Sequence, residues 1–240
     1  MAKGIYVATS GSMAQLRHME QISNNLANSR TAGFKADRMT FNEVVANNQD
    51  IAGAKERDKH FVDVELATPD ASSGPLARTD NPLDVAITGN GLLKVETARG
   101  VRLTKGGQLM LSRDGTLRTV TGHAVLNDKN QRITLPPDSV PEIDDDGAIW
   151  TEHGQIGRLG LSTIDLGRGL DKDPDGLFVP GAEAPPSADM RVLQGHLEDS
   201  NANPVRMMLD LIRVQRTFSA LRQVITASGD MDQLASRLPR

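Results

Sequence analysis

Histidine is the residue type in this chain best suited to metal binding or acid–base chemistry, but its spacing favours neither. The chain has five histidines, and no two of them stand at a separation typical of metal ligands within one helix or strand. They are His18, His60, His123, His153 and His196. A metal site would therefore require distant residues to converge, and we expect none. The remaining catalytic hypothesis is a hydrolase whose site combines His123 with Asp114.

Two acidic motifs fit turns better than cation sites. Asp144-Asp145-Asp146-Gly147 resembles part of a calcium loop, but it lacks the alternating ligands and the terminal glutamate of such loops. We predict an acidic turn there, followed by a strand at Ile149. The segment 171–176 also predicts a turn, in which aspartate side chains bond to the local backbone.

The glycine- and serine-rich motifs lack the context that catalysis would need. Gly89-Asn90-Gly91 and Gly106-Gly107 do not open a helix, as phosphate-binding loops do. Ser10-Gly11-Ser12 does not follow a strand, which a nucleophile elbow requires. We therefore predict that the chain is not an enzyme and that it uses no cofactor or metal.

Composition excludes several further classes. The chain of 240 residues has no cysteine, which rules out disulfides, thiolate metal sites and a cysteine nucleophile. Its net charge of -4 indicates neither nucleic-acid binding nor attraction to anionic membranes. No apolar run is long enough for membrane insertion, and the segment after Lys3 lacks the continuous apolar stretch of a signal peptide. These features predict a cytoplasmic protein unless it is exported by another route.

Apolar residues at helical spacing predict an amphipathic helix over residues 3–28. They are Ile5, Met13, Leu16, Met19, Ile22 and Leu26. Asn24, Asn25 and Asn28 provide polar side chains for the helix terminus, and Gly33 can adopt the positive φ that ends a helix. Gly11 weakens the helix by roughly 1 kcal/mol relative to alanine, so we expect it to be marginal alone.

The sequence pattern at the centre of the chain predicts β structure. Residues 36–80 are polar and predict an extended linker, with one candidate strand at 61–66. Residues 81–197 contain short alternating segments separated by turn residues, which predicts an antiparallel sandwich or irregular barrel. Within this region, Asp114-Gly115 predicts a hairpin with a mirror-image turn.

The C-terminal residues 198–240 return to helical spacing. Asn203 is the predicted N-cap and Pro204 the first helical residue. A heptad seam follows at Met207, Leu211, Val214, Phe218, Leu221 and Ile225, and Met231 and Leu234 extend it. Val205, Met208, Leu209 and Ile212 make this stripe wider than a two-stranded coiled coil requires. Such a helix spans roughly 45 Å, more than the β domain can cover, so we expect part of it to contact another helix.

The predicted fold class is therefore α+β. Long N- and C-terminal helices pair in a coiled-coil-like layer, and the middle forms a mainly antiparallel β domain. The expected boundaries are a helix and its terminus over 1–35, a linker over 36–80, a β domain over 81–197 and a helix over 198–240.

Ordered motifs along nearly the whole chain resemble the bacterial flagellar rod and hook proteins. Near the start they are Ile5-Tyr6-Val7-Ala8, Ile22-Ser23-Asn24-Asn25-Leu26-Ala27-Asn28 and Thr31-Ala32-Gly33-Phe34-Lys35. Further motifs occupy residues 81–91, 103–126 and 195–205. Within the family, the match is closest to the proximal rod subfamily, with the distal rod subfamily as the alternative.

The resemblance implies a structural subunit that assembles helically through its terminal helices and transmits torque. Expected partners are other copies of itself, other rod proteins and the flagellar export apparatus, which implies export to the periplasmic rod without a cleaved signal peptide. The implied assembly interface comprises Ile5, Met13, Leu16, Met19, Ile22, Asn24, Asn25, Leu26, Asn28, Gly33, Phe34, Asn203, Met207, Leu211, Val214, Phe218, Leu221, Ile225, Met231 and Leu234.

Two alternatives stay open from the sequence. The three asparagines either cap the helix within the chain or satisfy backbone groups of adjacent subunits. The chain as a whole is either a rod subunit or, less in keeping with its motifs, a ligand-binding β domain with its helices folded back.

Overall fold

The chain forms two compact units in a computed structural model, which describes residues 2–46, 59–64, 68–136, 139–163, 172–173, 175–180 and 190–237. The first, here called the helical unit, comprises Met1–Ala27, Asp37–Ala67 and Asn203–Arg240. The second, the β unit, comprises Asn28–Ala36 and Thr68–Ala202.

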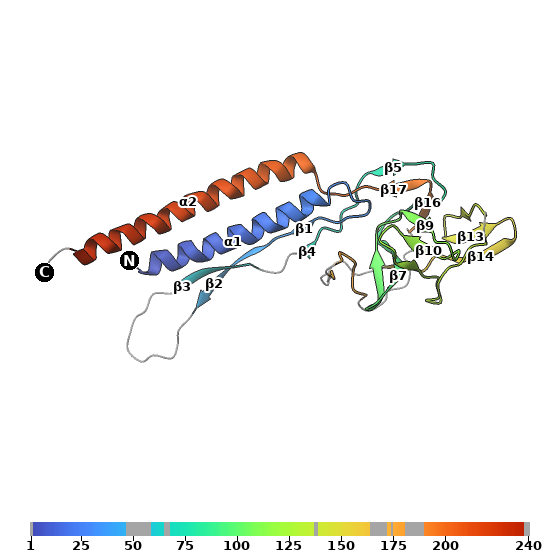
Figure 1. The fold of residues 1–240 in the computed structure, drawn as a ribbon, viewed down its shortest axis with the longest axis horizontal. Helices are drawn as coiled ribbons and strands as arrows, with labels where there is room; N and C mark the ends of the chain where they lie inside the picture. The colour runs from blue at the N-terminus through green and yellow to red at the C-terminus, as the bar shows by residue number, and fades with distance from the viewer. Residues whose placement is uncertain are drawn as a thin grey trace. The chain divides into compact units, whose positions relative to one another are not determined.

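Two antiparallel helices dominate the helical unit. Helix α1 (Ala2–Ala27) and helix α2 (Pro204–Arg237) lie side by side, with both chain termini at the same end of the pair (Figure 1). Gly11 of α1 lies against Leu221 of α2, where a Cβ atom on residue 11 would be in ordinary van der Waals contact with the Leu221 side chain at 3.6 Å. The predicted pairing of the terminal helices is confirmed.

The start of α2 has the predicted cap. The Asn203 side-chain oxygen accepts a hydrogen bond from the Arg206 backbone N–H at 3.1 Å, and its carbonyl accepts one from Met207 at 3.0 Å. Pro204 is the first helical residue, where its missing N–H costs nothing.

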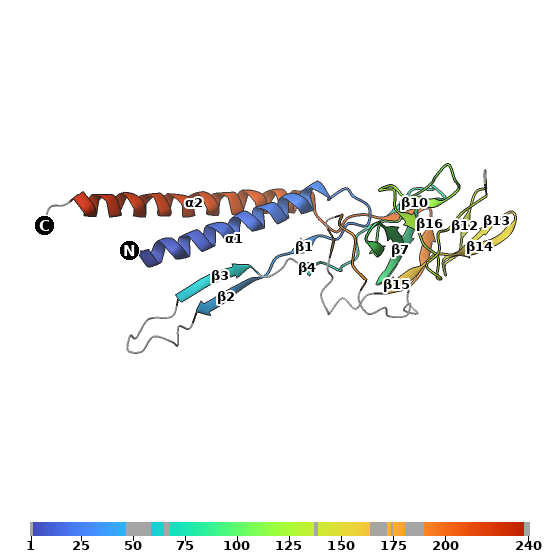
Figure 2. The same ribbon diagram turned by 60° about the horizontal axis from the view of Figure 1, so that its bottom comes forward.

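A β-hairpin accompanies the helices where the sequence predicts a linker. Strands β2 (Phe41–Ala46) and β3 (Lys59–Val64) pair antiparallel, with Phe41 opposite Val64 and Ala46 opposite Lys59. Strand β3 contacts α1 and runs beside it in the view of Figure 2. The predicted strand at 61–66 overlaps β3, whereas β2 carries no alternating pattern that would have predicted it. Strand β1 (Asp37–Arg38) also belongs to this unit.

The β unit consists of several small antiparallel sheets, as the sequence predicts. The largest has the order β15-β7-β11-β10-β9, with β8 added at β7. A three-stranded sheet has the order β12-β13-β14, and two pairs are β16-β6 and β17-β5. The bounds are β4 (Thr68–Pro69), β5 (Leu76–Arg78), β6 (Val85–Ile87), β7 (Gly91–Thr97), β8 (Gly100–Thr104), β9 (Leu109–Leu111), β10 (Leu117–Thr119), β11 (Ala124–Val125), β12 (Glu142–Ile143), β13 (Ala148–Thr151), β14 (Gly154–Arg158), β15 (Leu161–Thr163), β16 (Val192–Gln194) and β17 (His196–Glu198).

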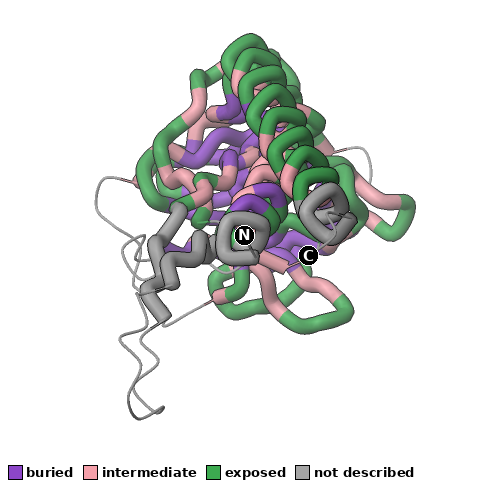
Figure 3. The backbone as a smooth tube through the Cα atoms, turned by 90° about the vertical axis from the view of Figure 1, so that its left-hand side faces the viewer, coloured by how far each residue is buried: buried purple, intermediate pink, exposed green. Residues whose placement is uncertain are grey.

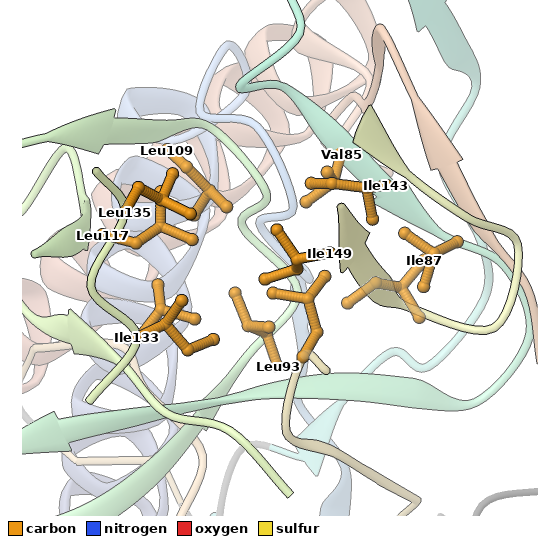
Figure 4. Close-up of a cluster of buried hydrophobic side chains, with 12 residues drawn as sticks. Val85, Ile87, Leu93, Leu109, Leu117, Ile133, Leu135, Ile143 and Ile149 are labelled. Carbon is orange, nitrogen blue, oxygen red and sulfur yellow. The ribbon is translucent and has the colours of Figure 1, made fainter. Parts of the chain in front are cut away.

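Besides a smaller buried cluster of Leu92, Leu103 and Phe178, aliphatic side chains from these sheets form the main core. Figure 4 shows them pointing toward one another from several strands, with Leu93 and Ile149 at the centre and no exposed surface on either. The cluster contains Val85, Ile87, Leu93, Leu109, Leu117, Val125, Ile133, Leu135, Ile143, Ile149, Leu159 and Val192. A core without aromatic residues fits a chain in which they make up only 3%.

The hairpin between β9 and β10 forms where it is predicted, but its turn differs. Gly115 has a positive φ of 76°, and Asp114 does not. A mirror-image type I′ turn requires positive φ at both central residues, so the prediction of that turn type is wrong. The Ser112 N–H instead bonds to the Thr116 carbonyl at 3.0 Å, which closes a longer loop with glycine in the left-handed position.

None of the helices that the structure describes combines the length and the apolar character needed to cross a membrane.

Candidate assembly interface

The predicted heptad seam of α2 is the side of that helix that turns toward α1. Val214 is buried, and Leu221 lies against Gly11 of α1. Leu221 is half-buried, as are Met207, Leu211, Phe218 and Ile225. The seam therefore makes contacts within the chain.

A second apolar surface of α2 lies at its N-terminal end, away from α1. Val205, Met208, Leu209 and Ile212 are 48–67% exposed, and we call them the root patch. Figure 3 shows exposed residues along most of α2. Because four large apolar side chains on successive turns are costly to leave in water, the root patch is a candidate binding surface.

The predicted interface residues of α1 also divide into two groups. Ile22 is buried, whereas Met19 and Leu26 are half-buried. Met13 and Leu16 are exposed. Met231 of α2 is exposed as well, and the side chains of Ile5 and Leu234 lie outside the described residues.

Asn25 is bonded within its own chain. Its amide nitrogen donates to the Asp37 carbonyl at 2.9 Å, and its amide oxygen accepts from the Asp37 N–H at 2.9 Å. The Gln21 amide nitrogen donates to the same carbonyl. For Asn25, this geometry favours the first of the two alternatives, a cap that ties the returning chain to α1. Asn24 is exposed on α1, and Asn28 lies beyond the helix, where its carbonyl accepts from Thr31.

Replacing Asn25 with alanine should destabilise the helical unit by about 2 kcal/mol, because it removes the hydrogen bond to the Asp37 N–H and one of the two donors to the Asp37 carbonyl. Thermal unfolding followed by circular dichroism at 222 nm measures this loss. Replacing its exposed neighbour Ser23 with alanine is the control and should change stability little. Equal effects of the two substitutions would contradict the assigned role of Asn25.

His18 introduces a pH dependence into the helix pair. Burial lowers the pKa of His18 below its ordinary value of 6.5, and Asp210 on α2 acts in the opposite direction. Asp210 is itself shared with Arg206 and Arg213, whose guanidinium groups lie 4.0 and 3.1 Å from its carboxylate. The folded chain therefore binds a proton at His18 less readily than the unfolded chain.

This lowered pKa predicts that the helical unit is less stable in mild acid. Below pH 6.5 the unfolded chain takes up a proton that the folded chain accepts only at lower pH, so stability falls as pH decreases through this window. Melting temperatures measured between about pH 5 and pH 8, roughly the range in which histidine titrates, should show this loss. His18→Gln should flatten the profile, and an unchanged profile would contradict the assignment.

The segment that follows α1 belongs to the β unit. Helix α1 ends at Ala27, so Gly33, which has the predicted positive φ of 72°, does not end the helix. Its N–H instead donates to the Glu198 carbonyl at 2.6 Å. The Phe34 ring lies 4.9 Å from the Lys172 ammonium, and the Phe34 carbonyl accepts from the Asn201 N–H. Both residues thus make contacts within the chain.

Three charged side chains meet beneath this segment in what we call the charge cluster: Lys35, Lys105 and Glu198. The Glu198 carboxylate lies 2.6 Å from the Lys35 ammonium and 3.5 Å from that of Lys105, and all three side chains are at least 94% buried. Glu198 also accepts the Gly74 N–H at 2.9 Å. Two ammonium groups thus share one carboxylate inside the β unit.

Backbone carbonyls complete the coordination of the two lysines. Lys35 donates to the Ser72 carbonyl at 2.8 Å, and Lys105 donates to the carbonyls of Gly89 and Gly91 at 2.6 and 3.0 Å. Burial lowers the pKa of Lys105, which Glu198 partly offsets and Lys35 reinforces. An adjoining cavity of 20 Å³ has room for one water molecule, which is too small for a cofactor.

Sequence reasoning did not identify the charge cluster as a site. Lys35, Lys105 and Glu198 each stand inside a family-like motif, but they come from three distant parts of the chain. The available signal was that each of the three motifs contains one of these charged residues.

The geometry does not bring the hypothetical hydrolytic residues together. The Asp114 carboxylate accepts from the hydroxyl and N–H of Thr116 at 3.0 and 3.3 Å, and these bonds, with Ser112, lower the pKa of Asp114. An open groove beside Asp114 is lined by Leu111, Arg113 and Pro136, but not by His123. Asp114 therefore stabilises its own turn.

The acidic motifs are turns, as predicted. The Gly147 N–H bonds to the Asp144 carbonyl at 2.8 Å, and Gly147 has a positive φ of 81°. Asp173 accepts the N–H groups of Asp175 and Leu177, although residues 171 and 174 of this motif lie outside the described part. Within the described ranges, no three histidine or acidic side chains gather as a metal site would require.

Comparison with known proteins identifies the family to which this chain belongs. A family model described as "Flagella basal body rod protein" matches residues 5–35, and one described as "Flagellar basal body rod FlgEFG protein C-terminal" matches residues 193–238. The flagellar basal-body rod protein FlgF of Rhizobium meliloti is 32% identical over 243 residues, covering 99% of this chain and 98% of that protein. The chain belongs to the flagellar basal-body rod protein family.

Other rod proteins match over similar lengths. FlgF of Mesorhizobium japonicum is 31% identical over 237 residues, covering 96% of each chain. The rod protein FlgG of Agrobacterium fabrum is 30% identical over 263 residues, covering 98% of each. This rod-family chain is accordingly a structural subunit of the flagellar basal-body rod and not an enzyme.

The two segments matched by the rod family models meet at the charge cluster. Lys35 is the last residue of the first matched segment, and Glu198 lies in the second. Their ion pair therefore joins the two ends of the rod-family sequence within the β unit.

Proposed function

We propose that this rod subunit assembles helically through its terminal helices and so forms part of the tube that transmits torque. Each helix has one side covered by its partner helix and one side with exposed apolar residues. The exposed set comprises the root patch on α2 and Met13 and Leu16 on α1. The root patch is the observation that carries the proposal, because its large side chains are most easily explained by burial against another subunit.

An open, helical assembly is expected because each copy carries several different apolar surfaces. When unlike surfaces of successive copies meet, the association continues and does not close on itself. We assign the chain to the proximal rod, which is supported by the FlgF relatives at 31% and 32% identity, with the distal rod as the alternative in view of FlgG at 30%.

A double substitution in the root patch tests the proposal. Met208→Asp with Leu209→Asp places two charges in the surface to be buried, so we expect the chain to fold but to be missing from purified basal bodies. Val120→Asp, at an exposed apolar position of the β unit, is the control and should be incorporated normally. Normal incorporation of the double variant would overturn the proposal.

We also propose that the chain reaches the periplasmic rod through the flagellar export apparatus without cleavage. Membership of the rod family supports this route. The intact mass of the chain recovered from basal bodies tests it, because removal of a leader would lower the mass below that of the translated sequence.

A further inference from the structure

We propose that the small cavity beside the charge cluster binds a single halide ion, chloride under ordinary conditions. The ion balances the positive charge of Lys35 and Lys105 that Glu198 leaves uncompensated. The described residues that form this site all belong to the β unit, so the site does not depend on assembly through the terminal helices.

The charge cluster carries one positive charge in excess. The Lys105 nitrogen faces three acceptors, which are the carbonyls of Gly89 and Gly91 and the Glu198 carboxylate. Only the protonated form of lysine has three N–H donors for them. Lys35 lies 2.6 Å from the same carboxylate. Two ammonium groups and one carboxylate therefore leave a net charge of one inside the β unit.

This excess charge is costly in the interior, because a buried ion loses its hydration. Burial and the neighbouring Lys35 lower the pKa of Lys105, and Glu198 offsets only part of this effect. A water molecule beside the lysines satisfies a hydrogen bond but leaves the charge in place. An anion there satisfies the same hydrogen bond and also supplies the missing negative charge.

The adjoining cavity provides a place for such an ion. Its volume of 20 Å³ holds one water molecule, and a chloride ion is only slightly larger. The described residues of its wall include Lys35 and Lys105 but no acidic residue. Gly89 is also in the wall, and its carbonyl lies 2.6 Å from the Lys105 ammonium, which places that charge beside the cavity. Polyatomic anions such as sulfate are too large for this volume.

Lys35 has a hydrogen-bond donor for the ion. An ammonium group carries three N–H donors. Among the described residues, the Lys35 ammonium has two acceptors, the Ser72 carbonyl at 2.8 Å and the Glu198 carboxylate at 2.6 Å. The Lys35 side chain is only 6% exposed, so bulk water has little access to the third donor. An anion in the cavity can accept this remaining hydrogen bond.

Urea unfolding of the full-length chain at varied chloride concentration tests the site. Sodium gluconate, whose anion is far too large for the cavity, replaces sodium chloride at constant ionic strength. The fluorescence of Trp150, the single tryptophan, follows the β unit. Chloride at about ten times its dissociation constant should lower the equilibrium constant of unfolding roughly tenfold, as expected for one site present only in the folded chain.

Two lysine variants separate binding at this site from general salt effects. Lys105→Met removes the excess charge, since Lys35 and Glu198 remain as a balanced pair, and its unfolding should not respond to chloride. Lys94→Met is the matched control, because Lys94 is also buried in the β unit but does not line the cavity. It should keep the response of the natural chain. An equal response in Lys105→Met, or no response in the natural chain, would overturn the proposal.

Anomalous diffraction from crystals of the natural chain soaked in bromide gives a measurement that needs no variant. Bromide replaces chloride in such sites and is located by its anomalous signal. A peak in the cavity, in contact with the Lys35 ammonium, supports the proposal. Bromide bound at surface residues alone, with a water molecule in the cavity, overturns it.

Discussion

Replacing Glu198 with glutamine is expected to destabilise the β unit by about 3–5 kcal/mol, because it leaves two buried ammonium groups without their shared carboxylate. Lys35 and Lys105 keep their backbone carbonyl partners, which satisfy their hydrogen bonds but not their charges. Urea unfolding measures the loss, and the fluorescence of Trp150 reports on the β unit alone because it is the single tryptophan.

The control for this prediction is an ion pair of similar chemistry at the surface. Glu96 lies 2.5 Å from Arg132, with side chains 39% and 59% exposed. Exposed pairs contribute roughly 0–1 kcal/mol, so Glu96→Gln should have a small effect. Adding Lys105→Met to Glu198→Gln should recover part of the stability, since one unpaired charge is removed. Similar losses for Glu198→Gln and Glu96→Gln would show that the charge cluster does not stabilise the fold.

Gly33→Ala is expected to destabilise the β unit by about 3 kcal/mol or more, through two separate costs. The left-handed conformation at φ 72° costs an alanine roughly 1–2 kcal/mol. A Cβ atom would also overlap the backbone of Lys105 and Gly106, between β8 and β9, and overpacking of this kind costs about 1–3 kcal/mol. Trp150 fluorescence during urea unfolding again gives the measurement.

Gly176 separates these two costs. It has a similar φ of 77°, but a Cβ atom there would meet nothing within 4 Å. Gly176→Ala should therefore show only the conformational cost of roughly 1–2 kcal/mol. If Gly33→Ala were no worse than Gly176→Ala, the close approach of residue 33 to residues 105–106 would be contradicted.

The terminal helices were predictable because their signals are local. The heptad seam of α2, the cap at Asn203 and the apolar periodicity of α1 all depend on residues within a few positions of one another. The antiparallel strands and the hairpin near Asp114 follow from the same kind of short-range pattern.

Features that depend on distant residues were not predictable from these patterns. The charge cluster requires residues 35, 105 and 198 to converge. No short-range sequence pattern indicates that these three residues lie together in the fold. Strand β2 pairs with β3 across 12 intervening residues that have no strand pattern, and its own sequence does not alternate. The hydrogen bonds of Asn25 were unpredictable for the same reason. Their partner, the backbone of Asp37, lies beside α1 only because the chain turns back after the helix.

The charge cluster has a consequence for the order of folding. Glu198 lies in β17, the final strand of the β unit, and its partner Lys35 lies 163 residues earlier. A chain that has emerged only as far as residue 190 lacks both β16 and β17. The contacts of Gly33 and Lys35 with Glu198, which hold Asn28–Ala36 in the β unit, cannot yet form. Contacts so far apart in sequence close slowly because they must first overcome the entropy of a long loop. The first and last parts of the β unit should therefore become ordered in a single late step, after the whole unit has been delivered.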